Sequence, residues 1–414
     1  MLLAQNYLAD ITPEQHFRDH CAWINHYPAL QHAPKFDFSD RRKDKPRLRI
    51  GYVSPDLHTH SVSYFLEPLW RHHDHERFEI FAYYSGPFNE ARRDPTNQRL
   101  RSYVDVWRDT AGMSDVALAQ GIYHDQIDIL VDLSGHMADN RMAVFAMKPA
   151  PVQVTWLGYP NTTGLPTMDY RITDAVADPE GLADRCHSEK LIRLDGSFLC
   201  YEGAQDVAVN PESPARRKGF VTFGSFNNLV KVQPPVISLW SKILHAAPGS
   251  RLLLKSLQLA NAGTRQHCLD AFAAHGITPE RLVLYGMLPG QDAHLRLYDE
   301  VDIGLDPFPY NGTTTTCEAA WMGVPTLTFS GQTHASRVGA SINVALGLQR
   351  WIATDEESYL TKAVEFSGDL DELALLRTGL RERLRASTLG DAPAFARRFE
   401  VACLEMWQSY QYSI

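Results

Sequence analysis

The sequence of 414 residues lacks any apolar run of the roughly 18 to 20 residues that a helix needs to cross a bilayer. Its first residues lack the basic region and the cleavage site of a secretory leader. Its six cysteines are scattered, without a CxxC pair or the spacing of a metal site. These absences predict a cytoplasmic protein with reduced thiols and no membrane partner.

The chain also lacks an excess of positive charge: its 40 lysines and arginines are outnumbered by 49 aspartates and glutamates, which gives a net charge of -9. This balance argues against a nucleic-acid partner. The chain also has no internal repeat and no low-complexity segment. Hydrophobic residues at 44% and charged residues at 21% describe a globular protein instead, and the length suits two or three domains.

What the chain does contain is a series of short apolar segments, separated by helical patterns such as 115–124. Strands that alternate with helices predict parallel sheets covered on both faces, in two doubly wound α/β halves. The predicted strands are 48–53, 78–84, 127–132, 152–157 and 170–174 in the first half, and 220–224, 251–255, 281–285, 301–306 and 325–329 in the second.

Composition divides the chain into four parts. Residues 1–46 look helical and end in a polar, basic stretch at 39–46. Residues 47–205 and 217–390 form the two Rossmann-like domains, joined by a polar, Pro-containing linker near 203–218. Residues 391–414 form a last helix with one apolar stripe that must be buried: Phe395, Phe399, Cys403, Met406 and Tyr410.

The most informative motif runs from Asn311 to Glu318, with the sequence NGTTTTCE. A strand, a Gly-containing turn and a helix N-terminus bring backbone N–H groups and the positive helix end to one place, which suits a phosphate. Gly312, Thr313, Thr314 and Thr315 are the candidate phosphate contacts, and Glu318 could accept hydrogen bonds from ribose hydroxyls. An ordinary capped helix is the alternative interpretation.

Four further loops at predicted strand ends carry Gly, Thr, His, Asn or Lys, at 54–61, 133–136, 158–164 and 224–231. Ligands of doubly wound sheets bind beyond the carboxyl ends of the strands, so these loops predict a crevice for a polar ligand. Further contacts to this ligand are proposed for residues of two of these loops: His136, Gly158, Tyr159, Pro160 and Asn161.

Several long motifs make the chain resemble the SPINDLY and O-GlcNAc transferase family of protein glycosyltransferases, over about residues 47–410. The segments that carry the resemblance are 51–60, 148–160, 168–174, 224–231, 311–325 and 335–339. The resemblance implies a glycosyltransferase B fold, in which two Rossmann-like domains face a central crevice that holds the donor. It also implies inverting transfer of a sugar from a nucleotide sugar to Ser or Thr hydroxyls of proteins.

The resemblance assigns roles to individual residues. Lys231 matches the lysine that stabilises the leaving diphosphate, where negative charge builds up as the glycosidic bond breaks. Thr314 and Thr315 match phosphate contacts, and Glu318 takes the place of the ribose-binding carboxylate. His294 matches a histidine that contacts the nucleotide.

His60 matches a histidine beside the acceptor site. Its ordinary pKa near 6.5 would suit removing a proton from a hydroxyl at neutral pH. A hydrogen-bonding surface histidine is the alternative.

The sequence predicts no metal site and no cofactor. Asp369 and Asp371 have the spacing of a DxD motif, but they follow Gly368 and precede a helical pattern, so they indicate an acidic helix start. The resemblance likewise implies metal-independent catalysis.

Two departures from the family leave alternatives open. Members of the family carry a long tetratricopeptide array, and this sequence has only 46 residues before the first strand. Protein capture is therefore expected to be different or weak, unless the sequence is part of a longer chain. Asn228 and Glu318 stand where the O-GlcNAc transferases have Gln and Asp, and Gln291 and Leu297 replace basic residues. UDP-GlcNAc is therefore the first choice of donor and GDP-fucose, the SPINDLY donor, the alternative. A non-catalytic nucleotide-sugar-binding scaffold and a carbohydrate or lipid glycosyltransferase are further possibilities.

Overall fold

The computed structural model describes residues 2–28, 30, 33–39, 41, 45–87, 94–204 and 206–413. Residues 40 and 42–44 of the predicted basic stretch, and the predicted domain boundary at residue 205, lie outside the described residues. None of the described helices is long and apolar enough to span a membrane.

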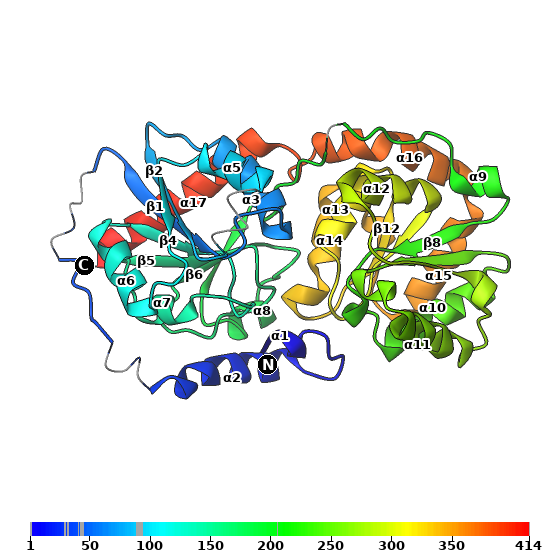
Figure 1. The fold of residues 1–414 in the computed structure, drawn as a ribbon, viewed down its shortest axis with the longest axis horizontal. Helices are drawn as coiled ribbons and strands as arrows, with labels where there is room; N and C mark the ends of the chain where they lie inside the picture. Colours follow the sequence, from blue (N-terminus) through cyan, green and yellow to red (C-terminus); the bar gives the residue numbers. More distant parts are fainter. Residues whose placement is uncertain are drawn as a thin grey trace. The chain divides into compact units, whose positions relative to one another are not determined.

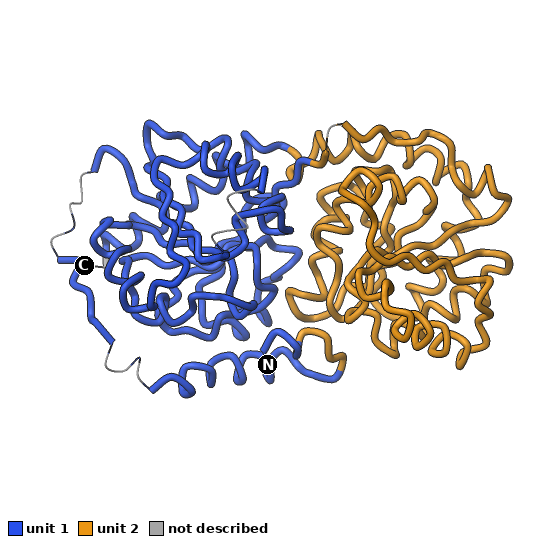
Figure 2. Tube along the Cα trace, in the orientation of Figure 1, with its two compact units in different colours: residues 1–5, 10–202, 391–414 blue, residues 6–9, 203–390 orange. Residues whose placement is uncertain are grey.

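The chain forms two compact units (Figure 2). Unit 1 comprises residues 1–5, 10–202 and 391–414, and unit 2 comprises residues 6–9 and 203–390. The N-terminal residues, expected to form a separate helical part, group with unit 1 except for residues 6–9, which group with unit 2.

Unit 1 is built on a seven-stranded sheet in the order β3-β2-β1-β4-β5-β6-β7, and every neighbouring pair is parallel. Strands β1, β2, β4 and β5 are almost wholly buried, as expected for a parallel sheet with helices on both faces (Figure 1). The strands are β1 (Leu48–Ser54), β2 (Phe78–Tyr84), β3 (Val106–Asp109), β4 (Ile129–Asp132), β5 (Val152–Thr155), β6 (Tyr170–Asp174) and β7 (Lys190–Leu194).

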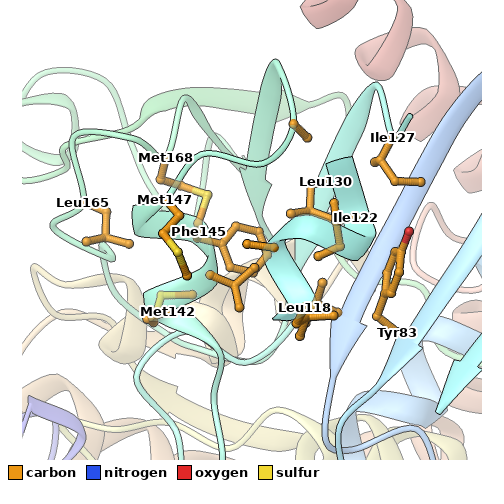
Figure 3. Packing of buried hydrophobic residues seen from close by; sticks show 14 of the residues in the cluster. Tyr83, Leu118, Ile122, Ile127, Leu130, Met142, Phe145, Met147, Leu165 and Met168 are labelled. Carbon is orange, nitrogen blue, oxygen red and sulfur yellow. The ribbon is translucent and has the colours of Figure 1, made fainter. Parts of the chain in front are cut away.

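The helices of unit 1 include two that build a buried core cluster against the sheet. Leu118 and Ile122 of α6 and Phe145 of α7 pack with Leu130 of β4 and Tyr83 of β2 (Figure 3). The helices are α1 (Leu2–Gln5), α2 (Pro13–Ala22), α3 (Ser61–Arg71), α5 (Pro95–Arg101), α6 (Asp115–His124), α7 (Met142–Ala146), α8 (Leu182–Arg185) and α17 (Ala392–Ser413).

Unit 2 repeats this plan with a six-stranded parallel sheet in the order β10-β9-β8-β11-β12-β13. Its strands are β8 (Thr222–Ser225), β9 (Arg251–Lys255), β10 (Leu282–Tyr285), β11 (Ile303–Leu305), β12 (Thr326–Phe329) and β13 (Ile352–Ala353). Its helices are α9 (Pro214–Lys218), α10 (Pro234–Ala246), α11 (Ala262–Ala273), α12 (Gly290–Arg296), α13 (Thr314–Trp321), α14 (Val338–Ala345), α15 (Glu356–Gly368) and α16 (Leu370–Arg385).

The predicted fold class of two Rossmann-like, doubly wound units is confirmed, and each of the ten predicted strands is present to within a few residues. Three strands were not predicted: β3, β7 and β13. Strands β3 and β7 carry charged, partly exposed residues, and β13 has only two residues, so none of them forms a long apolar run. All three lie at or next to a sheet edge, where burial on both faces is not required.

Helix α17 packs within unit 1, against α3 and strands β5 and β7. Of its apolar stripe, Phe395, Phe399, Cys403 and Met406 are buried. The ring of Phe399 lies 5.1 Å from that of Trp156, between centroids. A buried polar network adds to the contact, because Glu400 accepts hydrogen bonds from Asp74 N (2.8 Å) and His73 Nδ1 (2.9 Å). The helix is therefore part of the unit 1 core.

We expect the substitution Phe399→Ala to lower the free energy of unfolding of unit 1 by about 3–5 kcal/mol, because it leaves a cavity among large, closely packed rings. Val401 on the same helix is 52% exposed, so Val401→Ala is the matched control and should change stability by less than about 0.5 kcal/mol. Melting temperatures of the two variants check this. Equal melting temperatures would mean that α17 contributes little to the core.

Candidate functional site

The order of the strands in unit 2 identifies the carboxyl ends of β8 and β11 as the candidate ligand position. The strand order reverses direction at this pair, where Phe223 lies beside Ile303 and Gly224 beside Gly304. In open α/β sheets the loops that leave the carboxyl ends of such a pair diverge, and ligands bind there. Lys231 lies in the loop that follows β8, and Gly312 lies in the loop that follows β11.

The loop after β11 leads into α13, which begins at Thr314. Gly312 is buried, and a Cβ atom there would come within 2.6 Å of Thr315 Oγ1 and 3.0 Å of Asn227 Oδ1, so a larger residue would displace these two side chains. The N-cap residue Thr313 makes no side-chain capping bond within the described part of the chain. The first turn of α13 therefore has backbone donors and partly exposed threonine hydroxyls, which suit an anion.

A buried carboxylate holds this turn in place by hydrogen bonds. Asp306 is fully buried, and it accepts hydrogen bonds from Gly312 N at 2.6 Å and from Thr328 Oγ1 at 2.7 Å. Burial raises the pKa of Asp306 to about 7, although these bonds and the charge of Lys231 act in the opposite direction. The carboxylate thus holds the turn through the backbone of Gly312.

Lys231 is half-buried at the end of a short 3₁₀ turn, Leu229–Lys231. Its Nζ donates to the carbonyl oxygen of Asn311 at 2.6 Å and lies 3.8 Å from the ring centroid of Tyr310. Burial lowers the pKa of Lys231 to about 8, and the charge of Asp306 partly offsets this. The amine is therefore held beside the anion-binding turn.

Asparagines order the loop that carries Lys231. Asn228 Oδ1 accepts from Val230 N at 3.2 Å and from Gln258 Nε2 at 2.7 Å, so the exposed Asn228 caps the 3₁₀ turn. Asn227 Oδ1 accepts from Thr315 Oγ1 at 3.1 Å, which joins the two loops.

His294 of α12 and Glu318 of α13 form a pair beside the same turn. His294 Nε2 lies 2.9 Å from Glu318 Oε2, and the carboxylate is only 5% exposed. His294 Nδ1 is buried and has no hydrogen-bond partner among the described residues. The ring of Phe226 lies 5.7 Å from that of His294 and 4.1 Å from that of Tyr298, between centroids. Each predicted donor-site residue thus lies in or beside the two loops of unit 2.

The corresponding reversal in unit 1 lies between β1 and β4. His60 follows β1 and is the N-cap of α3, where its Nδ1 accepts from Val62 N at 3.3 Å. Asp56 Oδ2 lies 3.9 Å from the same Nδ1 and has no hydrogen-bond partner in the part of the chain that the structure describes. Burial lowers the pKa of His60 and raises that of Asp56, and each charge opposes the shift of the other.

His136 follows β4 and is half-buried, and its Nε2 lies 2.7 Å from the carbonyl oxygen of Thr163. Burial lowers the pKa of His136 and so favours the neutral ring. If Nε2 donates to that carbonyl, Nδ1 is the acceptor atom of the neutral ring.

The remaining predicted contact residues in unit 1 also have contacts within the loop itself. Gly158 is needed for its size, since a Cβ atom there would lie 1.9 Å from the carbonyl oxygen of Leu133. Pro160 is buried, and the carbonyl oxygens of the buried Tyr159 and Asn161 accept from the guanidinium of Arg171, at 3.0 and 2.8 Å. Arg171 therefore holds this loop through two of its backbone carbonyl groups.

The sequence did not indicate four residues that contact the predicted site residues: Asp306, Tyr310, Asp56 and His20. The buried His20 lies 2.7 Å from the Tyr159 hydroxyl, and burial lowers its pKa to about 3. Asp306 directly follows an apolar strand, and an acidic residue at a strand end is a signal that could have identified it. The partner of Tyr310 depends on tertiary contacts and has no local pattern.

Among the described residues no group of three or more His, Cys, Asp or Glu side chains could hold a metal ion. Asp369 of the DxD spacing caps α16, since its Oδ1 accepts from Glu372 N at 2.9 Å.

Known proteins resemble the chain over almost its whole length. Residues 18–208 and 215–399 match the model of glycosyl transferase family 41. A tomato (Solanum lycopersicum) protein named probable UDP-N-acetylglucosamine–peptide N-acetylglucosaminyltransferase SPINDLY is 42% identical over 410 residues, which cover 99% of this chain. The Arabidopsis thaliana protein of the same description named SEC is 32% identical over 87% of this chain and 37% of its own length. The chain spans only 44% of the length of the tomato relative.

Solved structures support the same assignment. The structure of a mutant of Thermobaculum terrenum O-GlcNAc transferase is 36% identical, with a TM-score of 0.91 over 100% of this chain and 78% of its own. Anabaena HepE, 9% identical with a TM-score of 0.58, shares the fold alone. The predicted resemblance and the predicted glycosyltransferase B fold are thereby confirmed. The chain belongs to glycosyl transferase family 41.

Proposed function

We propose that this protein is an inverting protein O-glycosyltransferase, which moves a sugar from a nucleotide sugar to Ser or Thr hydroxyls of proteins. The observation that carries the proposal is the Lys231 amine beside the N-terminus of α13, at the reversal point of a Rossmann-like sheet. The names of the SPINDLY, SEC and O-GlcNAc transferase relatives support it.

The chemistry follows from where charge develops. When the bond between the anomeric carbon and the β-phosphate oxygen breaks, negative charge appears on that oxygen. Lys231 and the N–H groups of the first turn of α13 would stabilise this charge without reorganising, because Asp306 and Asn311 already hold them in place. The His294–Glu318 pair would bind the ribose hydroxyls through the carboxylate.

On the acceptor side, the nitrogen atom with which His60 could accept a proton depends on its tautomer. While Nδ1 of His60 accepts from Val62, a neutral His60 ring carries its proton on Nε2 and can only donate there. To accept a proton at Nε2, His60 needs the tautomer with Nδ1–H, for which Asp56 Oδ2 is the available acceptor. Asp56 would therefore stabilise the tautomer of His60 in which Nε2 can accept a proton.

UDP-GlcNAc is the proposed donor, because the relatives that match the chain are named for it. GDP-fucose is the second candidate, favoured by Asn228 and Glu318 and by the exposed Gln291 and the buried Leu297 near His294. Incubating the protein with each labelled nucleotide sugar, and scoring both donor hydrolysis and transfer to proteins, tests the function and separates the donors. Nucleotide-sugar binding without hydrolysis or transfer would favour a scaffold.

We expect Lys231→Ala to retain the fold and to lower the transfer rate by at least about 100-fold, because a preorganised contact to the leaving oxygen is lost. Lys242→Ala is the matched control, since this lysine of α10 is 55% exposed in its side chain. Steady-state rates with saturating donor measure the effect. Comparable rates for the two variants would remove Lys231 from the proposed role.

We expect kcat/KM for the donor to fall as the pH rises above about 8, because Lys231 loses its charge over that range. The lysine is charged below this pH, so the loss is on the alkaline side. The residual activity of Lys231→Ala should lack this alkaline decline. A wild-type profile that stays level up to pH 9.5 contradicts the assignment.

We expect activity to survive washing with EDTA, because the proposed phosphate contacts are backbone N–H groups, threonine hydroxyls and one lysine. Transfer rates with and without added Mg²⁺ or Mn²⁺ check this. If washed enzyme worked only after one of these ions was restored, metal-independent catalysis would be wrong.

A further inference from the structure

Two aromatic rings stand behind the amine of Lys231, and neither belongs to the family motifs described above. The ring centroid of Tyr310 is 3.8 Å from Lys231 Nζ, within the range of a strong cation–π contact. The ring of Tyr7 lies 5.1 Å from that of Tyr310, at an interplanar angle of 38°. Tyr7 belongs to residues 6–9, which are part of unit 2, whereas residues 1–5 and 10–202 are part of unit 1 (Figure 2).

We propose that Tyr310 and Tyr7 are positioning residues for Lys231, with the ring of Tyr310 holding the ammonium group at the anion-binding turn and Tyr7 holding the ring of Tyr310. The inference rests on the proposed function, since it concerns the amine that would meet the leaving diphosphate. It assigns Tyr7 to the proposed donor site.

The carbonyl group of Asn311, which accepts from Lys231, is fixed by the other contacts of its residue and cannot move with the amine. Asn311 is fully buried, and its backbone N donates to Ala335 O at 2.9 Å. Its Nδ2 donates to Pro307 O at 3.0 Å, and its Oδ1 accepts from Gly339 N at 3.3 Å. A fixed carbonyl leaves the flexible lysine side chain as the part that must be positioned.

An ammonium group has three N–H bonds, and one of them is used by Asn311. The face of Tyr310 covers a second side of the group, where it attracts the charge without accepting a conventional hydrogen bond. The remaining N–H bonds are then restricted to the directions that neither group covers. Such restriction lowers the cost of orienting the amine when a phosphate binds.

The groups around Tyr310 keep its phenol neutral, as the contact with the charged amine requires. Burial, together with the nearby Tyr7, raises the pKa of Tyr310, so the phenol stays neutral across the working range. The titratable groups that face Lys231 are Asp306 and Tyr310, and Tyr7 lies behind Tyr310. Asp306 favours the charged lysine by attraction, but it is bonded to Gly312 and Thr328 and does not orient the amine directly.

The test measures the lysine itself as well as the reaction. The full-length protein is treated with an amine-acetylating reagent over a range of pH, and the acetylation of Lys231 is followed by mass spectrometry. Tyr310→Leu and Tyr7→Leu remove a ring but keep an apolar side chain, so water should not replace it. Leu8→Ala is the matched control, because Leu8 neighbours Tyr7 and is 48% exposed.

We expect the acetylation midpoint to fall by about 0.5–1 pH unit in Tyr310→Leu, and by less in Tyr7→Leu, because the charged amine loses its partner. The alkaline decline of kcat/KM should move with it, and kcat/KM should fall by roughly three- to tenfold. Tyr310→Phe keeps the ring and should restore the wild-type midpoint, and Leu8→Ala should match the wild type throughout.

Unchanged midpoints in both leucine variants would overturn the proposal, even if the protein transfers sugar normally. Shifted midpoints in a protein that transfers no sugar would support the positioning role while the proposed function fails. If Tyr310→Leu does not fold, judged by its melting temperature, the half-buried Tyr7 decides the question, because its replacement leaves the turn intact.

Discussion

A buried carboxylate at the carboxyl end of a central strand is the constraint on which each unit's binding loop depends. In unit 2, Asp306 binds the backbone N–H of Gly312 and the hydroxyl of Thr328 on the next strand, β12. Without that acceptor the turn would have to leave its N–H group unsatisfied in a buried place, which costs more than the bond itself contributes. The position of the glycine, of the α13 N-terminus and of the Asn311 carbonyl all follow from it.

Unit 1 uses the same device. Asp132 ends β4, and its carboxylate accepts from Ser134 N, Gly135 N and the hydroxyl of Thr155 on the next strand, β5. Burial raises the pKa of Asp132 to about 6, as it raises that of Asp306 to about 7. The two strands hold the same place in their sheets, beside the reversal point. An acidic residue is thus placed where two diverging loops need a common acceptor.

In the proposed function the two loops serve different chemistry, because different residues follow the shared acceptor. In unit 2 the turn continues into threonines and a helix N-terminus, with a lysine from the neighbouring loop, and this collects positive potential. In unit 1 the turn leads to His136, while the neighbouring loop supplies His60 and Asp56. Imidazole groups suit proton transfer better than charge neutralisation. The proposed division into a donor side and an acceptor side thus has a basis in each unit alone.

The sequence by itself determined the two parallel sheets, because alternation of apolar strands with helices leaves few other ways to bury both faces of each strand. It also indicated Lys231, Gly312–Thr315 and Glu318, since a strand, a turn and a helix start are contiguous and their chemistry can be read locally. The tertiary structure alone decided that Tyr310 lies over Lys231, that Tyr7 reaches Tyr310 and that Asp56 stands beside His60. It also decided the edge strands β3, β7 and β13, whose residues carry no strong period. These features depend on contacts between segments far apart in the chain or on burial, and neither is encoded in the spacing of neighbouring residues.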